Sequence, residues 1–505
     1  MKQKGTVYLV GAGPGDAGLL TRRGAELLAR ADVVVYDALV NPDLLRLAPK
    51  SAEFIYGGKR AAAHAIPQEE LNQLLVTKAK AGKCVVRLKG GDPYIFGRGG
   101  EEAEELAAVK VPFEVVPGVS SFFAGPNYAG IPVTHRDHCS SFTVLTGHED
   151  PTKDESSIDW AQLAKGGGTK VVLMGVERIR RIAEQLIAHG MAADTPVALV
   201  RWGTTGRQQS IEGTLATIAG VVEGAKFAAP AVTIIGGVVK LRAKLNWFEK
   251  RPLFGQRIVV TRTREQASEL AHRLTDLGAD VLEIPTIKIT APSKREVLAE
   301  AMGGLGTYQW IVFTSPNGVT SFFDYYFRAF DDIRGLGCVR LAAVGPATAA
   351  KLKELHLSVD AMPDKYVAKD IAKAIAAKDD LENLRVLLLR AEVANPELPR
   401  LLEEQGAIVD DVAVYQTVPE TEDVTGAAAR LLEDGADWLT FASSSAVENF
   451  HARFNLPALL KKFPALKTAS IGPETTKALV ALGLKPTVEA KPHTIDGLVK
   501  AVQAA

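Results

Sequence analysis

The sequence has few cysteines, no excess of either charge and no long apolar run. Its 505 residues contain three cysteines, Cys84, Cys139 and Cys338, which are too few and too scattered for a disulfide framework. Lys plus Arg and Asp plus Glu both total 59, so the whole-chain charge gives no case for binding nucleic acid or a membrane. No uninterrupted apolar stretch reaches about 18 residues, the length that a membrane-spanning helix needs. We therefore expect reduced thiols and a cytoplasmic protein without nucleic-acid or membrane partners.

Several catalytic signatures are also missing or incomplete. His135, Arg136 and Asp137 spell the HRD of protein kinases, but no lysine strand or DFG partner follows. His135, His138 and Cys139 lack a fourth ligand at a spacing that suits zinc, so we expect no metal. The second half of the chain has no nucleophile elbow and no Walker loop. Kinase and metal-dependent chemistry are therefore disfavoured.

The composition and the opening of the chain indicate a globular α/β protein. The chain has 47% hydrophobic and 23% charged residues, which is ordinary for a folded domain. Its length predicts roughly three or four domains of ~100–200 residues. A β-rich run at residues 6–10 is followed by a glycine-rich turn, a helical pattern at 20–31 and an apolar run at 33–36. Strand, turn, helix and strand in this order predict a parallel α/β sheet.

The glycine-rich turn resembles the fingerprint of nicotinamide enzymes but departs from it in two places. Asp16 stands where G-x-G-x-x-G needs its third glycine, and Pro14 lies inside the turn. Because the aspartate would repel a pyrophosphate, a nicotinamide enzyme is a weak alternative.

The most informative stretch is VVRLKGGDPYIFGRGGEE, at residues 85–102. Its glycines let a ligand approach the main chain, while Asp92 and Arg98 can fix the orientation of that ligand. Asp37 and Lys59 follow two other apolar runs, and the carboxyl ends of parallel strands meet at one edge of a sheet. A carboxylate and an amine at such an edge can move protons. The alternative is structural, with Asp37 capping a helix and Lys59 solvated in a turn.

Seven stretches of residues 5–249 occur in an order that resembles the uroporphyrinogen-III C-methyltransferase family. They are VYLVGAGPGDAGLLT, ADVVVYDALV, GGKR, VVRLKGGDPYIFGRGGEEAEEL, PGVSSFFAGPNYAGIPVTHRD, SSFTVLTGHE and PVALVRWGTT. The resemblance implies a two-lobed tetrapyrrole methylase fold with S-adenosylmethionine (SAM) between the lobes. It also implies two successive methylations at ring carbons of a porphyrinogen, which give precorrin-2.

The resemblance also assigns roles to single residues. Asp37 takes the role of proton acceptor and Lys59 that of proton donor. Ser120 and Ser121 stand where the family often has Thr-Ala or Thr-Ser, and both hydroxyls are expected to reach the cofactor. The other positions with an implied cofactor-binding role are Pro14, Gly90, Gly91, Asp92, Ile95, Met174 and Gly203.

The implied chemistry suits these residue types. Methyl transfer from a sulfonium is an in-line displacement that needs positioning more than covalent help, because an electron-rich pyrrole carbon is the nucleophile. The acetates and propionates of the substrate call for cations, and arginine suits carboxylates best. Arg98 and Arg136 are the strongest candidates for substrate binding. The wider set of cations is Arg22, Arg23, Lys59, Arg60, Arg87, Lys89, Arg98 and Arg136.

The region after residue 250 contains an internal duplication. RIVVTRTREQASELAHRLTDLGADV recurs as RVLLLRAEVANPELPRLLEEQGAIV, WIVFTSPNGVTSFF as WLTFASSSAVENFH, and LAAVGPATAAKLKELHLSV as TASIGPETTKALVALGLKP. Two tandem halves of one α/β plan are predicted, with a site between them. Charges and Pro252 interrupt the pattern at residues 247–255, which we predict to be a domain boundary.

The duplicated region, residues 253–505, resembles uroporphyrinogen-III synthase. That family closes linear hydroxymethylbilane with inversion of ring D, and it holds the reactive species without covalent catalysis. The resemblance implies two flavodoxin-like parallel lobes joined by a two-stranded linker near residues 285–290 and 413–418, so the lobes should not coincide with the repeats. We expect lobe A at about residues 253–285 plus 418–505 and lobe B at about 290–413.

Polar residues that follow apolar strands of this region are candidates for its site. Exposed helix N-termini bind carboxylates through free N–H groups, although Ser, Thr and Asn also cap helices without any ligand. The family's tyrosine corresponds to Tyr415, which can donate a hydrogen bond to a departing hydroxyl or simply pack in a strand. The substrate-binding candidates are Ser315, Thr348, Ser444, Thr475 and Thr476.

We interpret the chain as a bifunctional enzyme that forms uroporphyrinogen III and then methylates it toward sirohaem or cobalamin. Residues 1–250 are the predicted methyltransferase, with lobes at about 1–116 and 117–246, and residues 251–505 the predicted synthase. A homodimer through the methyltransferase half is part of this interpretation. The alternatives are a SAM-dependent methylase of the same fold that acts on a later precorrin or on RNA, a nicotinamide enzyme, and a pure binding protein.

Overall fold

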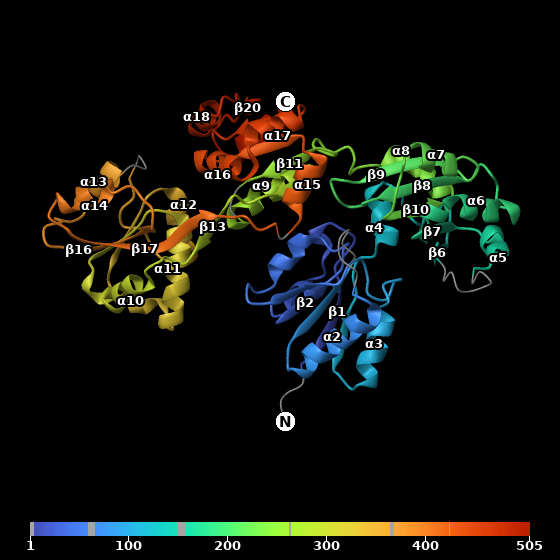
Figure 1. The fold of residues 1–505 in the computed structure, drawn as a ribbon, viewed down its shortest axis with the longest axis horizontal. Coiled ribbons are helices and arrows are strands. Elements are labelled where there is room, and N and C mark those ends of the chain that lie inside the picture. Colours follow the sequence, from blue (N-terminus) through green and yellow to red (C-terminus); the bar gives the residue numbers. More distant parts are fainter. Residues whose placement is uncertain (1–4, 59–65, 149–157, 262–263, 364–367, 424) are drawn as a thin grey trace.

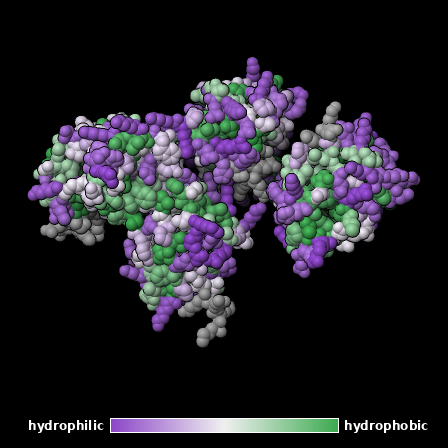
Figure 2. Space-filling model, turned by 180° about the vertical axis from the view of Figure 1, so that it is seen from behind, coloured by the Kyte–Doolittle hydropathy of each residue, from purple (hydrophilic) through white to green (hydrophobic). Residues whose placement is uncertain are grey.

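The computed structural model describes residues 5–58, 66–148, 158–261, 264–363, 368–423 and 425–505. Within these residues, the strands form four five-stranded sheets, and each sheet is covered by its own helices (Figure 1). The α/β prediction is confirmed. No helix of the described residues is long and apolar enough to cross a membrane. Seen from behind, the outer parts of the molecular surface are mostly hydrophilic, and apolar patches lie between these hydrophilic areas (Figure 2).

The first sheet is parallel throughout and has the order β3-β2-β4-β1-β5. Runs such as VVVY and VVRLK favour strands because β-branched side chains pack well on a pleated surface. Helix α1 packs against one face, and α2 and α3 cover the other. The elements are β1 (Val7–Gly11), α1 (Arg22–Leu28), β2 (Val33–Tyr36), β3 (Glu53–Tyr56), α2 (Gln68–Lys80), β4 (Val85–Lys89), α3 (Gly99–Ala108) and β5 (Phe113–Val116).

The second sheet is mixed and has the order β6-β7-β10-β8-β9, with β10 antiparallel to both of its neighbours. Helices α5, α6 and α7 contribute to the core on one face, and α4 packs on the other. The elements are α4 (Ser121–Tyr128), β6 (Phe142–Thr146), α5 (Trp160–Lys165), β7 (Thr169–Leu173), α6 (Ile179–Ala188), β8 (Pro196–Arg201), β9 (Gln209–Thr214), α7 (Ile218–Gly224), β10 (Ala231–Ile235) and α8 (Arg242–Leu245).

The third sheet has the order β12-β11-β18-β19-β20, which is the flavodoxin order 2-1-3-4-5. All of its pairings are parallel. Its elements are β11 (Arg257–Val260), α9 (Arg264–Asp276), β12 (Asp280–Glu283), α15 (Ala427–Asp434), β18 (Trp438–Phe441), α16 (Ser444–Phe454), α17 (Leu456–Lys462), β19 (Lys467–Ser470), α18 (Pro473–Ala481), β20 (Val488–Glu489) and α19 (Ile495–Ala504).

The fourth sheet has the order β13-β17-β16-β14-β15, and only its edge strand β13 is antiparallel. Strands β13 and β17 are also the two connections to the third sheet, so the two sheets exchange chain segments and do not follow the sequence repeats. The elements are β13 (Ile287–Thr290), α10 (Arg295–Gly303), β14 (Trp310–Phe313), α11 (Pro316–Ala329), β15 (Arg340–Ala343), α12 (Pro346–Glu354), α13 (Ala368–Ala376), β16 (Arg385–Ala391), α14 (Glu397–Glu403) and β17 (Ile408–Pro419).

The stretch at residues 247–255 is packed, although its composition suggests an exposed linker. Phe248 and Leu253 are each only 3% exposed. The ring centroids of Phe248 and Phe254 lie 5.5 Å apart. Nearby, a Cβ atom added to Gly206 would lie 2.2 Å from the carbonyl carbon of Ala279, so the two halves of the chain touch through their backbones. The aromatic side chains therefore bind this stretch to its surroundings in spite of its charges and its proline.

Candidate functional site

Loops at the carboxyl ends of β1 and β4 lie against each other. Gly13 and Gly91 pair through two backbone hydrogen bonds, of 3.2 Å from the Gly13 N–H and 2.7 Å from the Gly91 N–H. Pro14 follows Gly13 directly, and Gly90 follows the last residue of β4. The edge of the sheet thus carries the glycine-rich loops that the sequence assigns to the cofactor.

Asp92 organises the second of these loops. Its Oδ1 accepts a hydrogen bond of 2.8 Å from the Tyr94 N–H, and its Oδ2 accepts one of 3.0 Å from the Gly118 N–H. The carboxylate therefore ties the loop after β4 to the segment after β5. Carboxylates that accept backbone N–H bonds are strong loop anchors, because the acceptor is charged.

Gly91 leaves space at this edge that a side chain would fill. Gly91 has a φ of 68°, and a Cβ added to it would meet only the Ser120 Cα and the Ser121 N, each at 3.9 Å. Ser120 is 4% exposed and makes no side-chain capping bond to α4. Open backbone, a carboxylate-anchored loop and two nearby serines fit a polar cofactor such as SAM.

The second lobe meets this edge through the loop after β8, which contains Gly203. The Asp16 N–H donates a 3.0 Å hydrogen bond to the Thr204 Oγ1. A Cβ added to Gly15 would lie 2.7 Å from the Thr205 Cγ2, so the loops of the two lobes are in contact. The apolar candidates are Ile95, in the loop after β4, and Met174, which directly follows β7; they are 39% and 50% exposed.

Asp37 follows β2 at the same sheet edge and is held by an arginine. Its Oδ1 accepts a 2.7 Å hydrogen bond from the Arg87 Nη2, and its side chain is 30% exposed. The helix-cap alternative is wrong, because Asn41 caps the next helical turn through the Asp43 N–H. Lys59, its predicted partner in proton transfer, lies outside the described residues.

The predicted substrate cations have different environments. Arg98 is exposed, and its Nη2 lies 2.6 Å from the Glu101 Oε2; this hydrogen bond raises the pKa of Arg98. Arg136 is exposed in the turn at residues 135–139. Arg87 and Lys89, which belong to the wider set of predicted substrate cations, are each only 3% exposed. Their strand is covered by helices, so they cannot serve as solvated contacts for a substrate.

Two of the predicted residues of the second half lie together. Tyr415, on β17, is 7% exposed and belongs to the core of the fourth sheet. Its hydroxyl is 3.0 Å from the Ser315 Oγ, which also accepts a 3.1 Å hydrogen bond from the Gly318 N–H at the start of α11. Tyr415 is therefore packed and also hydrogen-bonded at the carboxyl end of β14.

The remaining candidates of the second half are mostly engaged in local structure. Thr348 is 1% exposed and donates to the Val344 carbonyl at 3.3 Å. Ser443, not Ser444, caps α16, with 3.1 Å between its Oγ and the Ala446 N. Thr475 is 3% exposed in α18.

Thr476 lies at the carboxyl end of β19. Its Oγ1 donates to the Glu489 carboxylate and is 2.7 Å from the Ser470 Oγ. The candidates are divided between the two lobes of this half. The lobe of the third sheet contains Ser444, Thr475 and Thr476, and the lobe of the fourth sheet contains Ser315, Thr348 and Tyr415.

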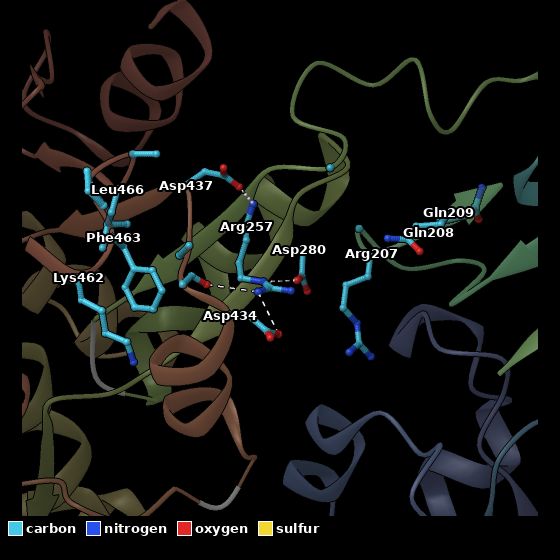
Figure 3. Close-up of a pocket in the computed structure, with 16 residues that line it drawn as sticks. Arg207, Gln208, Gln209, Arg257, Asp280, Asp434, Asp437, Lys462, Phe463 and Leu466 are labelled. Carbon is cyan, nitrogen blue, oxygen red and sulfur yellow. Dashed lines mark hydrogen bonds and ion pairs between the residues drawn. The ribbon is translucent and has the colours of Figure 1, made fainter. Parts of the chain in front are cut away.

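A polar pocket of about 530 Å³ lies where the two halves of the chain meet (Figure 3). Arg257 binds Asp280 and Asp434 on one wall, with distances of 2.9 and 3.3 Å. Arg207 extends from the other wall and stacks over Trp202 at 3.9 Å. Burial, with the nearby positive charge of Arg430, lowers the pKa of Arg207 to about 10. None of the predicted site residues lines this pocket.

A buried charge cluster lies between β4 and α3 and is not among the features predicted above from the sequence. It consists of Arg87, Lys89 and Glu102, and it reaches Asp37. A usable signal was present, because two charged residues alternate in the otherwise apolar run VVRLK, whose neighbours predict burial on both faces. Within the described residues, no group of three or more His, Cys, Asp or Glu side chains is placed to hold a metal ion.

Comparison with known proteins divides the chain into two halves, one with the first two sheets and one with the last two. Residues 6–219 match the family described as Tetrapyrrole (Corrin/Porphyrin) Methylases, and residues 268–500 match Uroporphyrinogen-III synthase HemD. A Ruminiclostridium josui protein named Porphyrin biosynthesis protein HemD is 39% identical over 499 residues, which are 98% of this chain and 97% of that protein.

Two further relatives match the first half. The S-adenosyl-L-methionine-dependent uroporphyrinogen III methyltransferase of Methanosarcina barkeri is 57% identical over 237 residues, 47% of this chain and 93% of that protein. A crystal structure of uroporphyrin-III C-methyl transferase from Thermus thermophilus, complexed with S-adenyl homocysteine, contains a protein that is 41% identical in sequence to this chain. The match covers 47% of this chain and 100% of that chain, with a TM-score of 0.40.

The fold and the matches define a two-part enzyme, a tetrapyrrole methylase followed by a pair of α/β lobes. The chain belongs to the family in which a tetrapyrrole methylase is fused to uroporphyrinogen-III synthase. It is a SAM-dependent uroporphyrinogen-III methyltransferase and a uroporphyrinogen-III synthase of tetrapyrrole biosynthesis.

Proposed function

We propose that the chain carries out two consecutive steps. The second half closes hydroxymethylbilane with inversion of ring D, and the first half then methylates uroporphyrinogen III twice to give precorrin-2, on the route to sirohaem or cobalamin. The observation that carries the methylation step is the meeting of the loops after β1 and β4 through Gly13 and Gly91, with Asp37 at the same edge.

The methyltransferase half positions its reactants and manages a proton. Bound SAM supplies an electrophilic methyl group. Gly90, Gly91 and the loop anchored by Asp92 hold the cofactor, with Pro14, Ile95, Ser120, Ser121, Met174 and Gly203 around it. Asp37 accepts the proton that the macrocycle loses after the methyl group has been transferred, and Lys59 is the proton donor. Arg98 and Arg136 bind carboxylates of the porphyrinogen.

The role of Asp37 is tested by the Asp37→Asn variant. The amide keeps the size of the side chain but cannot accept the proton as a carboxylate does, so we expect methyl transfer to fall by ~10²–10⁴. SAM affinity, measured by calorimetry, should stay near that of the unmodified chain. Full turnover by a folded Asp37→Asn enzyme would contradict the assignment.

The synthase half holds its substrate through hydrogen bonds from residues of both lobes. Tyr415 donates a hydrogen bond to the departing hydroxyl of hydroxymethylbilane, and Ser315 orients the phenol. The polar N-terminal turns with Thr348, Ser444, Thr475 and Thr476 hold acetates and propionates of the substrate through helix N–H groups. The 3.0 Å contact between Tyr415 and Ser315 supports the first of these roles.

The two activities belong to separable parts of the chain, residues 1–250 and 251–505. Each part holds two complete sheets. The proposed lobes are about residues 1–116 and 117–246 in the first part, and about 253–285 plus 418–505 and 290–413 in the second. Expression of the two parts should give two folded proteins with one activity each, although the packed Phe248 and Leu253 will become more exposed. Insolubility of both would contradict the division.

The assembly and location of the chain are also open to test. We propose a homodimer through the methyltransferase half and a cytoplasmic location, with tetrapyrroles as substrates and without a nucleic-acid or membrane partner. Light scattering on the full chain and on residues 1–250 should give twice the monomer mass in both cases. A dimeric full chain with a monomeric first half would place the contact elsewhere.

A further inference from the structure

Four charged side chains form one connected cluster beside the sheet edge, and three of them are buried. Arg87 and Lys89 point from β4 to the face covered by α2 and α3, and each is 3% exposed. Glu102, on α3, has a side chain that is fully buried, and Asp37 completes the cluster at the sheet edge. Burying ionised groups is costly unless they are paired, so the arrangement of these pairs is strongly specified.

Glu102 is the anchor of the cluster. Its Oε1 accepts hydrogen bonds from the Arg87 Nε at 3.1 Å, the Lys89 Nζ at 2.7 Å and the Gln68 Nε2 at 3.2 Å. Its Oε2 is buried and has no hydrogen-bond partner among the described residues. Burial lowers the pKa of Lys89, and the neighbouring charge of Arg87 adds to this effect.

Arg87 connects this anchor to the proposed proton acceptor. One edge of its guanidinium binds Glu102, and its Nη1 lies 3.5 Å from the Val35 carbonyl, so the plane of the group is fixed on two sides. The remaining Nη2 donates to the Asp37 Oδ1 at 2.7 Å. The other carboxylate oxygen of Asp37 makes no hydrogen bond to a described residue and is left for the site.

A purely structural role accounts for only part of this arrangement. The pair of Lys89 with Glu102 is enough to neutralise the carboxylate on α3 and to attach that helix to the sheet. The bond from Arg87 to Asp37 adds nothing to this attachment, because Asp37 is 30% exposed at the end of β2. What the bond does is to fix the orientation of the Asp37 carboxylate.

We propose that Arg87 is a positioning residue for methyl transfer, which holds Asp37 so that its free oxygen faces the carbon that loses a proton. The inference rests on the proposed role of Asp37 as proton acceptor. Arg87 itself does not touch the substrate, since it is buried beneath the sheet edge. Its effect on the reaction is therefore transmitted through Asp37 alone.

A double-mutant cycle in the full chain tests this dependence. Arg87→Lys keeps the charge but loses the planar guanidinium group that binds both Glu102 and Asp37. We therefore expect kcat for methyl transfer to fall by ~10–100-fold with SAM affinity unchanged. In the Asp37→Asn background, Arg87→Lys should cause no further loss. Arg180→Lys, at an exposed ion pair with Glu223, is the matched control and should leave the rate unchanged.

The outcomes separate the inference from the function on which it rests. If Asp37→Asn is slow and Arg87→Lys lowers the rate by the same factor in both backgrounds, Arg87 does not act through Asp37. Its effect then comes from the general structure of the protein, and the inference is wrong. If Asp37→Asn keeps full turnover, the acceptor role fails and the inference fails with it. If Arg87→Lys does not fold, Arg87→Gln replaces it in the same cycle, because its neutral amide places no cation in the buried site. Binding of SAM then shows whether the variant is folded.

Discussion

The hydroxyl of Tyr128 donates a hydrogen bond to Asp16, with the Oη and Oδ2 atoms 2.8 Å apart, and so joins the two lobes of the methyltransferase half. The Asp16 Oδ1 accepts a second bond, of 2.8 Å, from the Gly18 N–H. Burial raises the pKa of the Tyr128 hydroxyl, and the bond to Asp16 raises it further. The phenol therefore stays protonated and remains a donor at neutral pH.

Tyr128→Phe tests the importance of this connection between the lobes. The change keeps the ring and its packing on Trp247 and Phe248, but it leaves one Asp16 oxygen without its donor. Because the acceptor is charged, we expect the methyltransferase half to lose about 1.5–3 kcal/mol of unfolding free energy in urea titrations. Tyr325→Phe in the other half is the control. A Tyr128→Phe chain as stable as the parent would mean that the lobes are held by packing alone.

Asp92→Ala tests the anchored loop. Removal of the carboxylate frees the N–H groups of Tyr94 and Gly118 and loosens the loop that contains Gly90 and Gly91. We expect SAM binding to weaken by about 1.5–3 kcal/mol, measured by calorimetry. Asp276→Ala, at an exposed position of α9, should leave the affinity unchanged. Unaltered affinity in a folded Asp92→Ala chain would remove Asp92 from the cofactor site.

Tyr415→Phe tests the synthase half. The substrate cyclises slowly without enzyme to the uninverted isomer, so a failing synthase changes the product as well as the rate. Because the ring still packs while the hydroxyl bonded to Ser315 is lost, we expect the rate to fall about 10-fold or more. Methyl transfer from supplied uroporphyrinogen III should be unaffected. If the inverted isomer forms at the parental rate, the phenol only packs.

Glu249 should contribute to stability in a pH-dependent way. Its burial favours a higher pKa, but hydrogen bonds from Arg242, Gln208 and Ser210 outweigh burial and lower the pKa below its usual 4.5. A carboxyl whose pKa is lower in the folded state stabilises the fold above its unfolded pKa, and this contribution is lost as the pH falls through the folded value. The stabilisation should therefore be complete at neutral pH, begin to fall near pH 4.5 and disappear at the lower pH where the folded carboxyl takes up its proton.

The test compares Glu249→Gln with the parent in urea at several pH values. The variant should be less stable by about 1.5–3 kcal/mol at pH 7, and the difference should shrink in acid. A difference that does not depend on pH would show that the shape of the side chain matters and its charge does not.

The sequence predicts those parts of the site that follow from general rules of strand order. Asp37, Gly90 and Asp92 lie at one sheet edge because parallel strands end there, and an apolar run before each residue is visible in the sequence. The pair of Tyr128 with Asp16 has no such signal, because it depends on how two lobes meet. The packed Phe248 could not be predicted either, since the charges around it resemble those of a linker.

The product formed from hydroxymethylbilane tests the central claim most directly. The full chain is incubated with this substrate, with and without SAM, and the products are identified by chromatography and mass spectrometry. The account predicts uroporphyrinogen III without SAM and its dimethylated product, precorrin-2, with SAM. Formation of only the uninverted isomer, or of uroporphyrinogen III that stays unmethylated when SAM is present, would contradict it.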